Sequence, residues 1–309
     1  MNFNFEIYTT HFGLNKRPFT LVPDPECVYW SPAHLKAKAV LEYGMVNRAP
    51  ITMVVGEIGS GKTTLVRELL NQIEEEMTVG FIANAAPVDL ADMMRLILHS
   101  LGQDDLDEGE TTYPALYRRL EAFLVDEYAR GRRVVLIFDE AQNLGRDALE
   151  HLRMLTNINF SHHELVQLVL VGQPELRDIV MRSDMVQMAQ RISASVFLPA
   201  LREQDVQAYI EHRLAVAGAT RPLFDPDTFP LIFEVTGGTP RLVNQLCDFS
   251  LLYAYADESP TVTVQTIQRV LDDNLFFCAG RGRPLRLVHT EEDETEDETA
   301  RGRDDTHQR

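Results

Sequence analysis

Three glycines, a lysine and a threonine in the stretch GEIGSGKT, residues 56–63, have the spacing of a phosphate-binding loop. An apolar run over residues 51–55 precedes the loop, and a helix-forming segment over 64–76 follows it. Glycines let the backbone turn tightly, and the exposed N–H groups at a helix N-terminus attract anions. The pattern therefore predicts a triphosphate site. In it, Lys62 reaches the β- and γ-phosphates and the Thr63 hydroxyl ligates Mg²⁺.

The nucleotide predicted for this loop is ATP. The residues expected to contact it are Gly56, Glu57, Ile58, Gly59, Ser60, Gly61, Lys62, Thr63 and Thr64.

Two adjacent acids, Asp139 and Glu140, end the apolar run RVVLIFDE over residues 133–140. A continuous apolar run suits a strand that is buried on both faces of a parallel sheet. We expect Asp139 to hold the Mg²⁺ water shell and Glu140 to act as the general base on the attacking water. Together with the upstream loop, this pair predicts hydrolysis of ATP with Mg²⁺.

The composition sets limits on the class of protein. The chain has 309 residues, 45% of them hydrophobic, and a formal net charge of −18, which argues against bulk nucleic-acid binding. The three cysteines are far apart, without a metal-binding pair, and indicate a reducing, cytoplasmic compartment. No apolar run is long enough to span a membrane, and the N-terminus does not have the pattern of a signal peptide.

Hydrophobic periodicity divides the chain into four parts. Residues 1–48 form an N-terminal segment expected to pack on the nucleotide side, with aromatic residues suited to base stacking or to core packing. Residues 49–200 alternate strands and helices, which predicts a parallel α/β domain. Residues 201–275 are helical and predict a small lid domain. Residues 276–309 are polar and charge-rich, which predicts a disordered tail.

Further motifs carry a resemblance to a known family. These are FGLNKRPFTLVPDP and YWSPAH near the start, GEIGSGKTTL and IFDEAQNL in the centre, and VGQPEL, QRISA and GGTPRLVNQLCD towards the end. Over residues 8–274 the chain resembles AAA+ ATPases of the general secretion pathway protein A (ExeA-like) family. Exosortase-associated ATPases belong to that group, and transposition ATPases are more distant relatives. The resemblance implies a P-loop AAA+ three-layer sandwich followed by an all-α lid.

The same resemblance implies roles for four more residues. Gln173, which also lies at the carboxyl edge of the predicted sheet, matches the sensor 1 position. Arg191 matches the arginine finger that acts on a neighbouring subunit, with Arg182 as the alternative. Arg241 matches sensor 2 and contacts the γ-phosphate of its own subunit. Asn84 matches a residue that holds Glu140 inactive until a partner binds.

Three functions remain open at this point. The first is an AAA+ ATPase that works as a homo-oligomer, a ring or transient ring. It would remodel or regulate an unidentified protein partner of a secretion or envelope complex. The second is a nucleotide-gated interaction protein with slow hydrolysis, including a DNA-associated regulator of the transposition type, which a local basic patch would favour. The third, kinase-type transfer to another substrate, is disfavoured because no acceptor-substrate motif is visible.

The family's secretion members often continue into a membrane helix and an envelope domain. This chain has a polar tail in that place, which favours a protein without a membrane span.

Overall fold

The computed structural model describes residues 8–21, 25–71, 77–105, 112–160, 163–273 and 276. The predicted tail lies outside these ranges apart from Phe276. Residues Met1–Phe277 form one compact unit. Among the described residues, no helix combines the length and the apolar character that crossing a bilayer requires.

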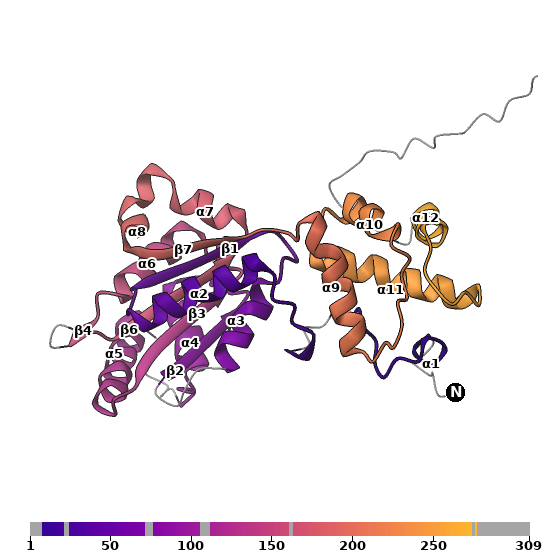
Figure 1. The fold of residues 1–309 in the computed structure, drawn as a ribbon. Helices are drawn as coiled ribbons and strands as arrows, with labels where there is room; N and C mark the ends of the chain where they lie inside the picture. The colour runs from indigo at the N-terminus through magenta and orange to yellow at the C-terminus, as the bar shows by residue number, and fades with distance from the viewer. Residues whose placement is uncertain are drawn as a thin grey trace, which may run out of the picture. The chain divides into compact units, whose positions relative to one another are not determined.

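Five parallel strands form the central sheet, in the spatial order β2-β3-β6-β1-β7 (Figure 1). The inner strands β1, β3 and β6 are almost wholly buried, which explains their continuous apolar sequences. The edge strand β7 alternates buried and exposed residues. The five strands are β1 (Ile51–Gly56), β2 (Met77–Ala83), β3 (Arg133–Asp139), β6 (Val166–Gly172) and β7 (Ile192–Leu198).

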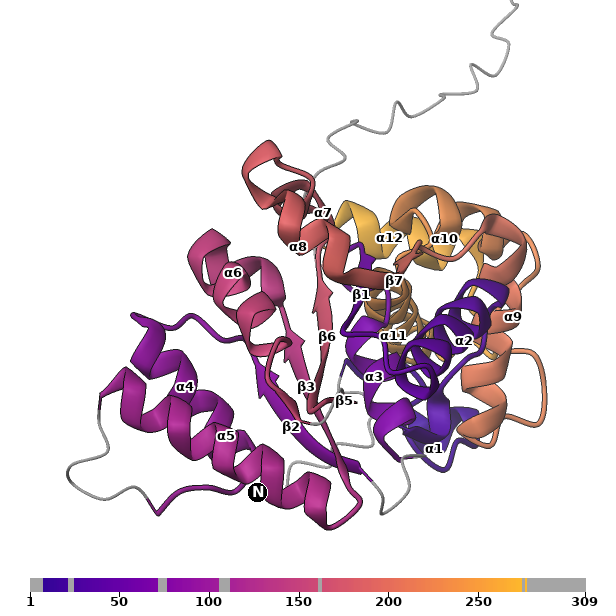
Figure 2. The same cartoon turned by 90° about the vertical axis from the view of Figure 1, so that its left-hand side faces the viewer.

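Helices cover both faces of the sheet, which makes three layers (Figure 2). Side chains of β3 alternate between the layers: Leu136 joins the core of one face and Ile137 the core of the other. The helices on one face are α2 (Pro32–Val46) and α3 (Lys62–Asn71). Those on the other face are α4 (Leu90–Ser100), α5 (Tyr113–Ala129), α6 (Gly145–Leu155), α7 (Pro174–Val180) and α8 (Val186–Arg191). The predicted α/β class is confirmed.

Four helices follow the sheet, as the change in periodicity after residue 200 predicts. They bury a core of their own that includes Ile210, Leu246 and Ile267. They are α9 (Glu203–Val216), α10 (Thr228–Thr236), α11 (Pro240–Ala256) and α12 (Val264–Asp272). We call this group the lid helices.

The N-terminal segment has two attachments. Its first part, with α1 (Thr9–Phe12), packs on the lid helices: Asn15 N donates to the Ala217 carbonyl (2.8 Å), and Arg213 Nε donates to the Pro18 carbonyl (2.7 Å). Its second part is α2, which packs on β1 and β7. The chain therefore passes from the lid helices to the sheet before the first strand begins.

Short elements complete the described chain. The 3₁₀ helices are η1 (Pro25–Cys27), η2 (Ala141–Leu144) and η3 (Ser183–Met185). A hairpin of two-residue strands, β4 (Asn159–Phe160) and β5 (His163–Glu164), lies beside the sheet and was not predicted.

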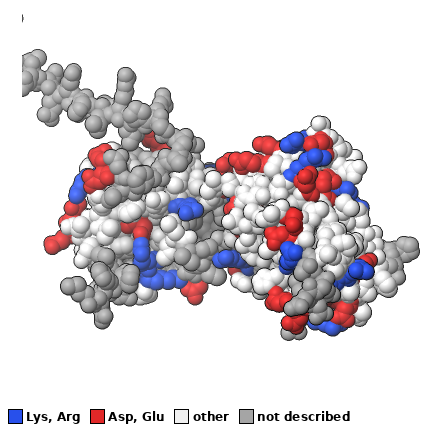
Figure 3. Space-filling model, turned by 180° about the vertical axis from the view of Figure 1, so that it is seen from behind, with Lys and Arg blue, Asp and Glu red and all other residues white. Residues whose placement is uncertain are grey.

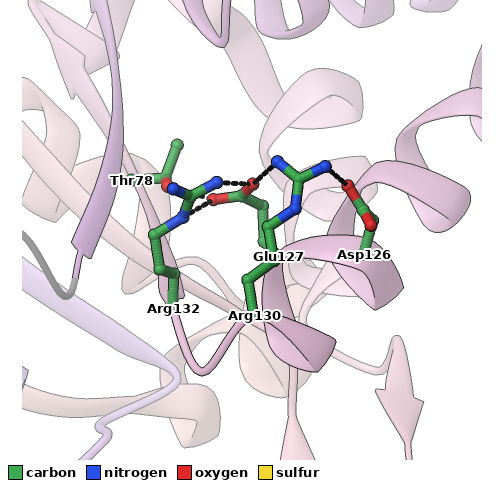
Figure 4. A network of polar contacts seen from close by, with 5 residues as sticks. All are labelled: Thr78, Asp126, Glu127, Arg130 and Arg132. Carbon is green, nitrogen blue, oxygen red and sulfur yellow. Dashed lines mark hydrogen bonds and ion pairs between the residues drawn. The ribbon is translucent and has the colours of Figure 1, made fainter.

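Glu127, near the end of α5, is the buried centre of a polar network (Figure 4). Arg132 donates to both of its carboxylate oxygens, Arg130 pairs with one of them, and the Thr78 hydroxyl of β2 also donates. Hydrogen bonds from Arg132 are the main reason that the pKa of Glu127 is lowered, against the opposing effect of burial. The network joins α5 and the turn after it to the edge strand β2.

Replacing Glu127 with Gln should lower the free energy of unfolding by about 1–3 kcal/mol, because a buried charged hydrogen-bond network loses its centre. The folded pKa of Glu127 lies below its ordinary value of 4.5. The contribution of Glu127 to the free energy of unfolding is therefore present above about pH 4.5 and is lost as the pH falls through the pKa of the folded state. Denaturant unfolding at pH 7 and at pH 4 measures both effects. Glu121→Gln, at an exposed position on the same helix, is the control. Equal stabilities of the two variants would contradict the assignment.

Candidate functional site

A cavity of about 350 Å³ lies at the carboxyl ends of the strands, beside the loop that follows β1. Residues 58–65, from the loop and the first turn of α3, form one wall of the cavity. Glu140, at the tip of β3, also lines the cavity. The N-terminal segment contributes Tyr29 and Trp30, and the lid helices contribute Arg241. The volume is that of an ordinary small-molecule site. Three regions that are distant in sequence thus enclose one space, where open α/β sheets bind their ligands.

The loop between β1 and α3 has the conformation that its glycines predict. Gly59 and Gly61 have φ angles of +75° and +98°. A Cβ atom on Gly59 would lie 2.6 Å from the Cβ of Arg241, and one on Gly61 would lie 3.0 Å from Nε2 of His34. Larger residues are therefore excluded by both backbone strain and contact.

Lys62 folds back over this loop. Its Nζ donates to the carbonyl oxygens of Gly56 (2.8 Å) and Glu57 (2.9 Å). Burial lowers the pKa of the amine, and the nearby carboxylates of Glu140 and Asp139 oppose that shift without reversing it. The loop thus holds an ammonium group against its own carbonyl oxygens, from which the group can turn to bind phosphate oxygens.

Thr63 and Asp139 contact each other across the sheet. The Thr63 hydroxyl, in the first turn of α3, donates to Asp139 Oδ2 at 2.7 Å. The other oxygen, Oδ1, accepts from the backbone N–H of Glu140 at 3.0 Å. A hydroxyl and a carboxylate this close form the pair of oxygen ligands that Mg²⁺ prefers.

Glu140 is held by two side-chain amides. Gln142 Nε2 and Gln173 Nε2 both donate to Oε2 of Glu140, at 2.6 and 3.0 Å. Burial alone would raise the pKa of Glu140, but these bonds and the charge of Lys62 outweigh it and lower the pKa. The carboxylate is therefore ionised at neutral pH, as a general base must be.

Gln142 also joins two strand tips. Its Oε1 accepts from the backbone N–H of Gln173 at 3.1 Å, so it joins the end of β3 to the end of β6. The sequence analysis placed Gln173 near the site but did not single out Gln142. The signal for it is its place two residues after Glu140 in the stretch DEAQ.

Asn84 follows β2 and lies beside the tip of β3, with its backbone N–H donating to the Asp139 carbonyl at 3.2 Å. Its side-chain Oδ1 accepts from Asn143 Nδ2 at 2.8 Å. The described side-chain bonds of Glu140 go to Gln142 and Gln173, so the structure does not bring Asn84 onto the carboxylate. Both Asn84 and Glu140 have positive φ angles, 52° and 55°.

His34 supports the loop from α2 and was not singled out from the sequence. Its Nε2 lies 3.1 Å from the Ser60 carbonyl, and its Nδ1 lies 2.7 Å from the Ser31 hydroxyl, which caps α2. Burial lowers the pKa of His34, so the ring is neutral at pH 7. Because a carbonyl only accepts, Nε2 carries the proton. The sequence signal that could have identified His34 is the pair Ser31-Pro32, which starts a helix, with the histidine two residues after the proline.

Arg241 enters from the lid helices. It is in the first turn of α11, and its backbone N–H donates to the Gly59 carbonyl at 3.3 Å. Deeper in the same wall, the Tyr209 hydroxyl donates to Asn244 and accepts from Arg213. The structure thus places the predicted sensor 2 arginine at the cavity, in contact with the phosphate-binding loop.

Arg191 lies far from this cavity. It ends α8 directly before β7, whereas Leu198, at the other end of β7, pairs with Gly56. Seven strand residues separate the two ends by roughly 20 Å. The guanidinium of Arg191 pairs with Glu164 at 3.1 Å and also bonds to Asn157. The alternative, Arg182, is more exposed and pairs with Asp184.

These residues fit a nucleoside triphosphate and its Mg²⁺. The ammonium group, the glycine turns that a Cβ would fill and the Thr63–Asp139 pair are the donor set for such a ligand. In addition, the Ser60 hydroxyl is buried in the loop and has no hydrogen-bond partner among the described residues. A buried polar atom of this kind is consistent with a loop built to bind a polar ligand.

Comparisons with known proteins show which proteins this chain is similar to. Residues 46–180 match the family described as AAA domain. General secretion pathway protein A of Aeromonas hydrophila is 38% identical over 251 residues, which are 81% of this chain and 45% of that protein. The chain thus spans about half the length of this relative.

Solved structures share the fold at low sequence identity. The ORC2 protein of Aeropyrum pernix, in ADPNP–ADP complexes, aligns with a TM-score of 0.64 at 19% identity, over 84% of this chain and 72% of that one. Cdc6p of Pyrobaculum aerophilum aligns with a TM-score of 0.67 at 16% identity, over 85% and 72%.

The sheet order, the loop and the lid helices define a P-loop protein of the AAA+ class. Within that class, the chain is a relative of general secretion pathway protein A, and the resemblance predicted from its motifs is confirmed.

Replacing His34 with Ala should weaken nucleotide binding by about five- to thirtyfold, because the Ser60 carbonyl loses its donor and the loop loses its support. Titration with a fluorescent ATP analogue measures the dissociation constant. His34→Gln, which keeps an N–H donor, should recover part of the affinity. Unchanged affinity in His34→Ala would show that the loop holds its conformation without this bond.

Replacing Gln142 with Ala should shift the acidic limb of the pH–rate profile for ATP hydrolysis to higher pH. The amide lowers the pKa of Glu140, so its loss raises that pKa, and less of the base is ionised at low pH. Rates from about pH 3.5 to 7 measure the shift, because the pKa of Glu140 in the wild type lies below its ordinary value of 4.5. Gln103→Ala, outside the site, is the control. A parallel loss of rate at every pH, without a shift, would contradict this role.

Proposed function

We propose that this chain binds ATP in the cavity and hydrolyses it with Mg²⁺ as a homo-oligomer. The observation that carries the proposal is the convergence of Lys62, the Thr63–Asp139 pair and Glu140 on one space beside Arg241. Mg²⁺ held by Thr63 and Asp139 would neutralise charge on the phosphates. Lys62 would turn from the loop carbonyls to the β- and γ-phosphates.

Glu140 takes the proton of the attacking water in this proposal, since its carboxylate is ionised and reaches the cavity. Gln173, bonded to Glu140, would orient the same water. Arg241 would bind the γ-phosphate from the lid helices, so that loss of this phosphate changes the contact between lid and loop. That coupling would let hydrolysis move the lid helices and act on a partner.

The position of Arg191 favours an oligomer. An arginine at the far end of β7 cannot reach the cavity of its own subunit, so a role in hydrolysis requires a neighbouring copy. Its bonds to Glu164 and Asn157 would have to open first. This requirement favours slow hydrolysis in the isolated chain and activation on assembly.

We infer a protein partner in secretion or envelope-associated assembly, in keeping with the relative named above. The action is proposed for the cytoplasm, where a reducing environment fits the thiol of Cys247, which forms no disulfide among the described residues. The net charge of −18 disfavours the alternative of a DNA-associated regulator. Among the described residues on the face shown in Figure 3, acidic and basic side chains are interspersed and form no basic stripe.

Three variants test the proposal in an ATPase assay. Lys62→Ala should abolish nucleotide binding. Glu140→Gln should keep binding and lose at least about a hundredfold in rate. The rate per subunit should rise with protein concentration, and mixing in Arg191→Ala should lower the rate of the wild type.

Arg182→Ala is the matched control in this mixing experiment, because it removes the alternative arginine. If Arg182→Ala lowers the ATPase rate of the wild type on mixing and Arg191→Ala does not, the arginine finger is Arg182. A low rate that is independent of concentration would instead identify a nucleotide-gated interaction protein. Normal hydrolysis by Lys62→Ala would overturn the proposal.

A further inference from the structure

A second cavity, of about 440 Å³, lies at the opposite edge of the sheet. Arg133 at the start of β3, Arg48 just before β1 and Glu164 just before β6 line it, together with Arg132 and Tyr128. These residues mark the N-terminal ends of the strands, whereas the nucleotide cavity lies at their carboxyl ends. The two cavities are therefore separate sites.

The charges around this cavity do not cancel. Arg132 is neutralised by the buried carboxylate of Glu127 (Figure 4), and Glu164 is neutralised by Arg191. Arg133 donates to the Met45 carbonyl at 3.3 Å. Over the described part of the chain, no ion pair joins an acid to Arg48 or Arg133. Two guanidinium groups that pair with no acid of the described residues thus line a hollow in a protein whose net charge is −18.

Arg48 has an unfavourable backbone conformation. Its φ angle is 55°, in the turn where α2 ends: its N–H donates to the Met45 carbonyl (3.4 Å), and that of Ala49 donates to the Gly44 carbonyl (2.8 Å). Glycine is the residue favoured at this position, because a Cβ atom makes the left-handed conformation unfavourable. The guanidinium is therefore kept at a cost in stability.

Three other described residues that are not glycine have positive φ: Asn84, Glu140 and Glu258. Glu258 follows α11 in the same kind of turn as Arg48 after α2. Asn84 and Glu140 lie at the nucleotide site, and strained backbone of this kind concentrates where a side chain has a function. Arg48 combines the same strain with a charged side chain that lines a cavity.

We propose that this cavity binds a carboxylate-rich peptide segment, with Arg48 and Arg133 receiving its carboxylates. A planar guanidinium pairs with a carboxylate through two parallel hydrogen bonds, and a hollow accepts single side chains. An extended polyanion such as DNA would instead meet the repulsion of a strongly acidic protein. The proposal does not depend on ATP hydrolysis.

The sequence itself contains a segment of this chemistry. Residues 291–298, EEDETEDE, hold seven acids among eight residues. A peptide of residues 291–300 is therefore a suitable probe of this chemistry, and the natural occupant that we propose is an acidic segment of a partner protein.

The test is fluorescence anisotropy of the labelled peptide with the full chain at low salt. The measurement is then repeated with a full-length variant in which the seven acids of 291–298 are changed to Gln and Asn. In this variant the chain's own segment cannot compete with the labelled peptide. Arg48→Gln and Arg133→Gln should each weaken binding by about tenfold. Arg67→Gln, an equal change of charge at an exposed site on α3, should leave binding unchanged, as should Lys62→Ala in the nucleotide site.

Arg48→Gly separates function from folding. It should lose peptide binding while raising the midpoint of thermal unfolding by about 2 °C, because glycine relieves the strain. Glu258→Gly, at the corresponding turn after α11, should raise the midpoint and leave binding unchanged. Failure of the peptide to bind both the full chain and the neutralised variant would overturn the proposal. The proposal would also be overturned if Arg48→Gln bound the peptide as tightly as the wild type does. A third contrary result would be that the protein binds a DNA duplex instead of the peptide and that this DNA binding depends on Arg48.

Discussion

The hydrogen bond between Thr63 and Asp139 depends on the order of the strands. Thr63 follows β1 and Asp139 ends β3, but β6 lies between these two strands. Side chains from β1 and β3 must therefore meet over the tip of β6, across roughly 10 Å of sheet. The chain turns at once into α7 after β6, and Gln173 stands in that gap. A different strand order would separate the proposed metal ligands, the proposed base and the residue proposed to orient water.

The parts of the site that could be predicted were those with a local signature. Two parts of the site are contiguous motifs: the loop of residues 56–63 and the acids at 139–140. The buried parallel strands can be recognised in the sequence as apolar runs. The start of α3 was predicted two residues late, because the helix begins within the motif, at Lys62.

The parts that could not be predicted depend on contacts between distant residues. His34 reaches Ser60 from 26 positions away, and Gln142 reaches the backbone of Gln173 from 31 positions away. No periodicity in the sequence encodes such pairs. The strands β4 and β5 are only two residues long each, too short for any alternation of hydrophobicity to show. The hairpin matters because Glu164, at its end, holds Arg191.

The two attachments of the N-terminal segment have a topological consequence. The lid helices are joined to the sheet once by the chain after β7 and a second time through the N-terminal segment, whose Pro18 carbonyl accepts a bond from Arg213 and whose Ser31 caps α2. A second link closes a loop of chain and so reduces the conformational freedom that the lid gains when it separates from the sheet. We therefore expect the lid helices and the sheet to unfold together.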